Sequence, residues 1–204
     1  MKSLSIESSL LLVHDVVNHF LDESDPALSA VLENLRRLLQ AAREARLPIV
    51  FAAPGQGDPA IGVRGSTAAQ GKNIWGTVAA DVPAALGPLP GEVVIRKPRY
   101  GAFFGSRLSD HLKQTGRDTL IVCGISLAGG VETTVRDADN RDLSSIVVAD
   151  ACLCRPVSDQ GWGHVTSEDV AKVTLSIMAQ RFADVATTAD ICAALRQLDR
   201  SPSR

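Results

Sequence analysis

The sequence predicts an α/β fold, a three-layer α/β/α sandwich built on a mostly parallel six-stranded sheet. Two observations carry this prediction. Short apolar runs of strand length alternate along the chain with segments of helical periodicity, as in a sheet with right-handed crossover connections. The apolar runs are also continuous, a pattern typical of parallel strands that are buried on both faces.

Each expected element follows from local residue choice. Asp25 and Pro26 predict the start of a helix, with Asp25 as its N-cap and Pro26 in its first turn, that continues to about Arg46. The other expected helices span 106–114, 127–140, 167–179 and 188–198. The six expected strands span 9–13, 48–53, 92–96, 118–123, 144–149 and 181–185. We expect one domain over residues 1–204, with a disordered polar tail at 199–204.

Composition excludes several functional classes. The formal net charge of the 204-residue chain is −2, so its overall charge does not favour nucleic acid or an anionic membrane surface as a partner. No segment approaches the roughly 20 apolar residues of a membrane span, and the N-terminus has no secretory pattern. We therefore expect a cytoplasmic protein that contacts neither membrane nor nucleic acid. The four cysteines are expected to be buried structural thiols.

Candidate functional residues follow the ends of the predicted strands. Binding sites in open parallel sheets form beyond the carboxyl ends of the strands. His14 and Asp15 follow the first strand, Lys97 follows the third, and Asp150 follows the fifth. Asp15 is either a general acid or base tuned by partial burial or a helix-capping or turn aspartate. Lys97 is either a surface lysine or a cleft residue, and its alternation with apolar Ile95 favours the cleft.

The fourth strand leads into a glycine-rich turn, Gly124–Gly130, before a helix. Backbone N–H groups at such a turn can hold a carboxylate or an oxyanion. The spacing of its glycines does not match a dinucleotide-binding fingerprint, and no Lys-Ser/Thr pair follows Gly130 as in a phosphate-binding loop. No metal site is expected, because His14, His19 and Asp15 do not make a ligand cluster. No cofactor is expected either.

Taken together, these motifs resemble the isochorismatase-like hydrolase family. The resemblance runs in order from about Ser9 to Ile191. It rests on the segments Leu11–Asp15, Lys97–Phe104, Gly116–Ile125, Arg136–Ala138 and Val148–Ala151. It implies a Rossmann-like sheet and a homo-oligomer, a dimer or tetramer.

The resemblance also assigns roles to residues. Most members of the family are cysteine hydrolases that act on amides through an aspartate, a lysine and a cysteine. The first two correspond to Asp15 and Lys97, whereas the cysteine position holds Gly130, which offers no nucleophile. Members that cleave a vinyl ether also have glycine there. They protonate an enolpyruvyl methylene carbon, and water then captures the resulting oxocarbenium ion.

On this resemblance Asp15 is the general acid, and Lys97 positions it or the substrate carboxylate. The expected substrate-binding residues are the turn, the histidine before the acid and nearby aromatic residues: Ile125, Ser126, Gly129, Gly130, His14, Phe20, Trp75 and Phe103. A nearby ammonium favours an ionised carboxyl, so desolvation by the aromatic residues has to keep Asp15 protonated.

Three departures from the vinyl-ether subgroup keep two functions open. Val17, Ala53 and Ser126 stand where that subgroup carries polar substrate contacts. Because buried polar contacts give large substrate discrimination, the loss of these contacts argues against isochorismate itself as the substrate. The first hypothesis is a cofactor-independent hydrolase of a small carboxylated vinyl ether. The second is a relative of the amidases that has lost its nucleophile and acts as a ligand-binding or partner subunit.

Overall fold

A computed structural model describes residues 4–22, 24–55, 74 and 77–200 of the chain. Its centre is a six-stranded sheet in which every neighbouring pair is parallel. The strands are β1 Ser9–His14, β2 Ile49–Pro54, β3 Val93–Lys97, β4 Thr119–Ile125, β5 Ser144–Leu153 and β6 Asp184–Ala186, in the spatial order β3-β2-β1-β4-β5-β6. The predicted α/β fold with a parallel six-stranded sheet is therefore confirmed.

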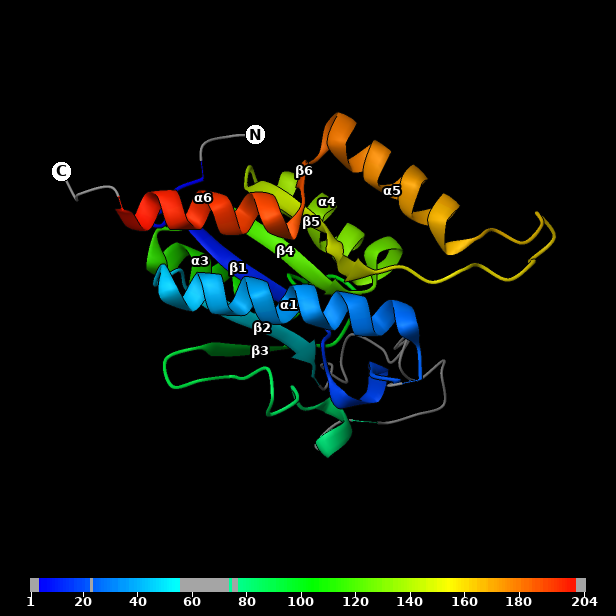
Figure 1. Ribbon diagram of the computed structural model, residues 1–204, viewed down its shortest axis with the longest axis horizontal. Coiled ribbons are helices and arrows are strands. Elements are labelled where there is room, and N and C mark those ends of the chain that lie inside the picture. Colours follow the sequence, from blue (N-terminus) through cyan, green and yellow to red (C-terminus); the bar gives the residue numbers. More distant parts are fainter. Residues whose placement is uncertain (1–3, 23, 56–73, 75–76, 201–204) are drawn as a thin grey trace.

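Helices cover both faces of this sheet. Figure 1 shows α1 (Pro26–Glu44) and α6 (Thr188–Arg200) side by side in front of the sheet, with α3 (Leu108–Thr115) and α4 (Glu132–Asp139) behind it. Helix α5 (Ser167–Arg181) extends beyond the β6 edge. Among the described residues, no helix is both long enough and apolar enough to cross a membrane.

The start of α1 matches its sequence signals. The Asp25 carboxylate accepts hydrogen bonds from the amides of Ala27 and Leu28 at 2.9 and 3.4 Å, and Pro26 occupies the first turn. The apolar stripe of the helix, Leu28, Val31, Leu35, Leu38 and Leu39, is buried against the sheet. A cap and an apolar stripe therefore fix both the beginning of α1 and the face that it buries.

Four segments differ from the sequence-based prediction. The strand expected at 181–185 is β6, Asp184–Ala186, because Arg181 is still part of helix α5. Residues Leu127–Val131 form a kinked turn before α4, with non-helical backbone at Ala128 and Gly129, where a single helix was expected from Leu127. Strand β5 continues to Leu153, four residues past its predicted end, after a register shift against β4. Helix α6 runs through Arg200, so the expected tail does not begin at Asp199, and residues 201–204 lie outside the described range.

Gly124 of β4 has a backbone conformation that aims any Cβ atom at the neighbouring strand β1. His14 pairs with Gly124 of β4, and Gly124 has φ of +125°. A Cβ atom at Gly124 would lie within 3 Å of the His14 backbone nitrogen and carbonyl carbon. Only glycine fits this approach, because any side chain there would meet the neighbouring strand.

Candidate functional site

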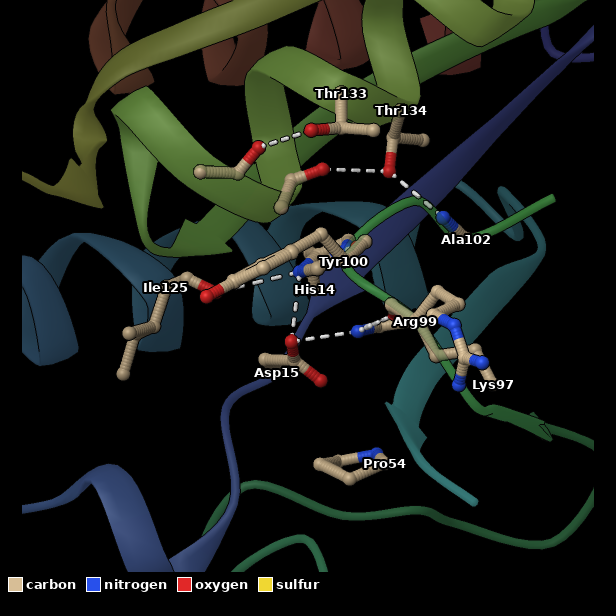
Figure 2. Close-up of polar contacts among 12 residues, drawn as sticks. His14, Asp15, Pro54, Lys97, Arg99, Tyr100, Ala102, Ile125, Thr133 and Thr134 are labelled. Atoms are coloured by element: carbon tan, nitrogen blue, oxygen red, sulfur yellow. Dashed lines mark hydrogen bonds and ion pairs between the residues drawn. The ribbon is translucent and has the colours of Figure 1, made fainter. Parts of the chain in front are cut away.

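Asp15 and Lys97 form a buried ion pair across the carboxyl end of β2. Lys97 Nζ lies 2.7 Å from Asp15 Oδ2 and also donates to the Arg99 carbonyl oxygen at 2.9 Å (Figure 2). The Lys97 side chain is only 3% exposed and that of Asp15 is 12% exposed. The Asp15 amide donates to the Ala52 carbonyl of β2 at 2.8 Å, which holds its backbone at a φ of 49°.

This geometry excludes two of the alternatives left open by the sequence. The carboxylate of Asp15 binds Lys97 and serves as no helix cap, and Lys97 is not a surface lysine. Lys97 shares its strand face with buried Ile95, as the alternation predicted. Because removing two charges from water costs free energy that their attraction must offset, such a pair points to a function beyond stability.

One oxygen of Asp15 is left open. Asp15 Oδ1 is buried, and no group among the described residues forms a hydrogen bond with it. Buried polar atoms in native proteins almost always have a partner, and an exception calls for a reason. Since Lys97 occupies Oδ2, Oδ1 is the oxygen available to a substrate or to a transferable proton.

His14 is completely buried beside the pair. Its Nε2 lies 2.9 Å from the Tyr100 carbonyl oxygen, and its Nδ1 lies 3.3 Å from the Ile125 carbonyl and 3.4 Å from Asp15 Oδ2. Burial, followed by the charge of Lys97, lowers the pKa of His14 to about 4, so the ring is neutral near pH 7. A neutral ring has one N–H group, and the shorter contact assigns it to Nε2.

The turn after β4 passes beside His14. The carbonyl oxygen of Ser126 accepts from the amides of Gly129 and Val131, both at 3.2 Å. Thr134 Oγ1 donates to the Gly130 carbonyl at 2.7 Å and accepts from the Ala102 amide at 3.0 Å (Figure 2). The structure thus brings Asp15, Lys97, His14 and this turn together at one edge of the sheet.

Phe103 and Phe20, two further predicted site residues, have other described surroundings. Phe103 is buried in the hydrophobic core, with the Arg141 guanidinium 4.7 Å from its ring centroid. Phe20 is half-buried in a short 3₁₀ turn, Asn18–Phe20, that follows Asp15 in the chain. Among the described residues, neither ring has a recorded contact with the ion pair, so their substrate-binding roles stay predictions. Trp75 lies outside the described residues.

Asp150 does not join the site, contrary to its predicted position. Its Oδ1 accepts from the amide and the hydroxyl of Thr188 at 2.7 and 2.9 Å, at the start of α6. Strand β5 passes through Asp150 and ends three residues later. The carboxylate therefore fixes α6 to the sheet.

Three contributors, Arg99, Tyr100 and Thr134, were not among the predicted catalytic or substrate-binding residues. Tyr100 acts through its backbone carbonyl, and Arg99 likewise receives the Lys97 ammonium on its carbonyl. Every residue type has the same backbone carbonyl, so the sequence does not indicate which carbonyls make these contacts. Thr134 lies one helical turn after Gly130, and its buried hydroxyl donates to the Gly130 carbonyl four residues earlier. Hydrogen bonds of this kind from threonine to the backbone are a known helical pattern, so this contact could have been anticipated.

Neither the buried cysteine thiols nor a metal-ligand cluster adds chemistry to the site among the described residues. Burial raises the pKa of the Cys152 thiol to about 12 and that of Cys123 well above its usual value, so neither forms a thiolate readily. Within the described ranges, no three His, Cys, Asp or Glu side chains gather into a group that could hold a metal ion.

Comparison with known proteins identifies the family. Residues 9–190 match the isochorismatase domain model. The chain is 35% identical to a probable isochorismatase of Pseudomonas chlororaphis over 73% of each sequence. It is 31% identical to the phenazine biosynthesis protein PhzD1 of Pseudomonas aeruginosa over 93% of this chain and 87% of the other. A cysteine hydrolase from Pseudomonas syringae superposes with a TM-score of 0.87 at 24% identity over 97% of both chains, which supports the fold.

These matches agree with the ordered motifs and with the parallel sheet. The chain therefore belongs to the isochorismatase family of hydrolases.

Proposed function

We propose that the protein hydrolyses a vinyl ether of a small carboxylated substrate, an enolpyruvyl ether like that of isochorismate, with Asp15 as the general acid. The observation that carries the proposal is Asp15 Oδ1, which has no hydrogen-bond partner among the described residues and is buried beside a lysine that occupies the other oxygen. A proton on Oδ1 has no competing acceptor among the described residues. It is therefore available to a carbon atom of a bound substrate.

The proposed reaction balances without a covalent enzyme intermediate. Asp15 Oδ1 transfers its proton to the terminal methylene carbon of the enolpyruvyl group, which becomes a methyl group and leaves an oxocarbenium ion. Water adds to that cation, and the resulting hemiketal releases pyruvate and the alcohol. Asp15 then regains a proton from the water that added. Lys97 holds the carboxyl group in place through Oδ2 and steadies the negative charge that appears when the proton leaves.

The neutral state of Asp15 needs support against the nearby ammonium. General-acid catalysis requires Asp15 to take up a proton when the substrate binds, and a substrate carboxylate brought beside it would act in that direction, since like charges repel. His14 adds no positive charge, because its burial and the Lys97 charge keep the ring neutral. These effects act in the direction that general-acid catalysis requires.

A second function has its own supporting observation. Val17 and Ala53, at positions where the vinyl-ether subgroup carries polar contacts, are both buried and apolar in this chain. A site that has lost polar contacts can bind a ligand without turning it over. In that case the protein would be a non-catalytic relative of the amidases, acting as a ligand-binding or partner subunit.

An assay of pyruvate release separates the two functions. Isochorismate and related enolpyruvyl ethers are supplied to the protein, to Asp15→Asn and to Asp81→Asn. Asp81 forms a matched acid–base pair at the surface, 2.8 Å from Arg96. We expect release by the parent and the Asp81 variant and a loss of about 10²–10⁴-fold in the Asp15 variant. Absence of release from every ether would reject the proposal and favour the binding function.

A further inference from the structure

His14 occupies the space into which a side chain at residue 130 would point. A Cβ atom built on Gly130 would lie 2.8 Å from Nδ1 and 2.8 Å from Nε2 of the His14 ring, and closer still to the Cε1 atom between them. Real Cβ atoms do not approach other heavy atoms so closely. Any side chain at residue 130, cysteine included, therefore overlaps the imidazole as it stands.

The imidazole has little freedom to move aside. His14 is fully buried in the central strand, between Ala52 of β2 and Gly124 of β4. Its ring lies between the Tyr100 carbonyl at Nε2 and the Ile125 carbonyl at Nδ1, as Figure 2 shows. Rotating the ring away would break the Nε2 hydrogen bond and leave the Tyr100 carbonyl without its donor.

The backbone of Gly130 is held in place from the other side. Its carbonyl accepts from Thr134 Oγ1 at 2.7 Å, and Thr134 Oγ1 in turn accepts from the Ala102 amide at 3.0 Å. Thr134 is fully buried. The 100–102 segment therefore anchors both partners: Tyr100 holds the His14 ring, and Ala102 holds the turn that carries Gly130.

We infer that His14 is a specificity-determining residue, whose ring excludes a thiol nucleophile from position 130 and so closes the covalent route to amide hydrolysis. The glycine alone is not the barrier, because replacing it by cysteine would leave the imidazole in the thiol's place. This inference concerns the space beside β4. It stands apart from the proposed vinyl-ether reaction and holds or fails independently of pyruvate release.

A coupling experiment tests the inference. Gly130→Ala is made in the parent and in a His14→Ala background, and Tm is measured for all four proteins. We expect the alanine at 130 to lower Tm by about 5–10 °C in the parent, or to prevent folding. In the His14→Ala background it should have little effect. An equal loss in both backgrounds would overturn the inference, because independent sites add.

Saturation mutagenesis of residue 14 keeps the test decisive if the single variants do not fold. Every residue is placed at position 14 together with Gly130→Ala or Gly130→Cys, and soluble folded protein is scored. Recovery should be confined to small residues such as Gly, Ala and Ser. Recovery with no residue, or equally with large ones, would overturn the inference. Gly129→Ala is the matched control, since a Cβ atom at Gly129 would meet only the Ser126 hydroxyl, at 2.8 Å. Changes at residue 14 should not rescue it.

A chemical readout then asks whether the opened space admits a working thiol. The folded His14→Ser, Gly130→Cys protein is treated with iodoacetamide, and the sites of modification are mapped by mass spectrometry. The thiolate forms a bond to the CH₂ carbon as iodide leaves. We expect modification at residue 130 and none at Cys123, which is fully buried and serves as the internal control. Equal protection of both thiols would contradict the inference.

Discussion

Breaking the ion pair between Asp15 and Lys97 should destabilise the protein far more than breaking a surface pair of the same length. Lys97→Met keeps the apolar stem and removes the ammonium, so that a buried carboxylate stays behind without its counter-charge. The Lys97 side chain is 3% exposed, and Nζ lies 2.7 Å from the carboxylate. Loss of one partner from such a buried pair costs about 3–5 kcal/mol.

The matched control is the pair formed by Arg96, the neighbouring residue, with Asp81. Its N–O distance is 2.8 Å, but its side chains are 46% and 53% exposed. Asp81→Asn should therefore lower the free energy of unfolding by no more than about 1 kcal/mol. Urea denaturation followed by circular dichroism gives both values. Adding Asp15→Asn to Lys97→Met should restore part of the lost stability, because the unpaired charge is removed as well.

Two outcomes would refute this reasoning. A loss for Lys97→Met as small as that for Asp81→Asn would mean that burial does not set the strength of the pair. A double variant less stable than Lys97→Met alone would mean that the carboxylate is not the source of the loss.

Three further predictions follow from the same structure. Because the folded-state pKa of His14 is about 4, below its unfolded value of 6.5, unfolded chains bind its proton first as the pH falls. His14 therefore contributes stability above pH 6.5 that is lost between about pH 6.5 and pH 4, about 3 kcal/mol in all, and NMR of the His14 ring should show no titration above pH 5. Asp25→Ala should lower the free energy of unfolding by about 1 kcal/mol through loss of the α1 cap, and Asp25→Ser should restore most of it; an unchanged alanine variant would contradict the capping role. Cys123 and Cys152 should resist iodoacetamide in native protein and react once it is unfolded; labelling of either in the native state would show that burial does not protect them.

Much of this architecture could be predicted because it depends on local patterns. Continuous apolar runs gave the strands, and Asp25 with Pro26 gave the start of α1. The rule that sites lie at the carboxyl ends of parallel strands brought Asp15 and Lys97 together, although 82 positions separate them in sequence. Each of these predictions needs only side-chain chemistry and periodicity.

The parts that could not be predicted depend on backbone geometry and on long-range contacts. The register shift between β4 and β5 extends β5 past Asp150, which then binds Thr188 of α6 instead of facing the site. The kink at Ala128 and Gly129 before α4 has no residue signature of its own. The overlap of the His14 ring with a side chain at Gly130 follows only from how closely β1 and the turn approach each other.

Deuterium transfer tests the central claim most directly. Isochorismate, or another enolpyruvyl ether that the protein accepts, is hydrolysed in D₂O, and the pyruvate is reduced to lactate as it forms to prevent exchange. Proton donation by Asp15 to the methylene carbon predicts a methyl group with one deuterium, no covalent protein adduct in the mass spectrum, and loss of the product with Asp15→Asn. A methyl group without deuterium, or unchanged turnover in Asp15→Asn, would contradict the account.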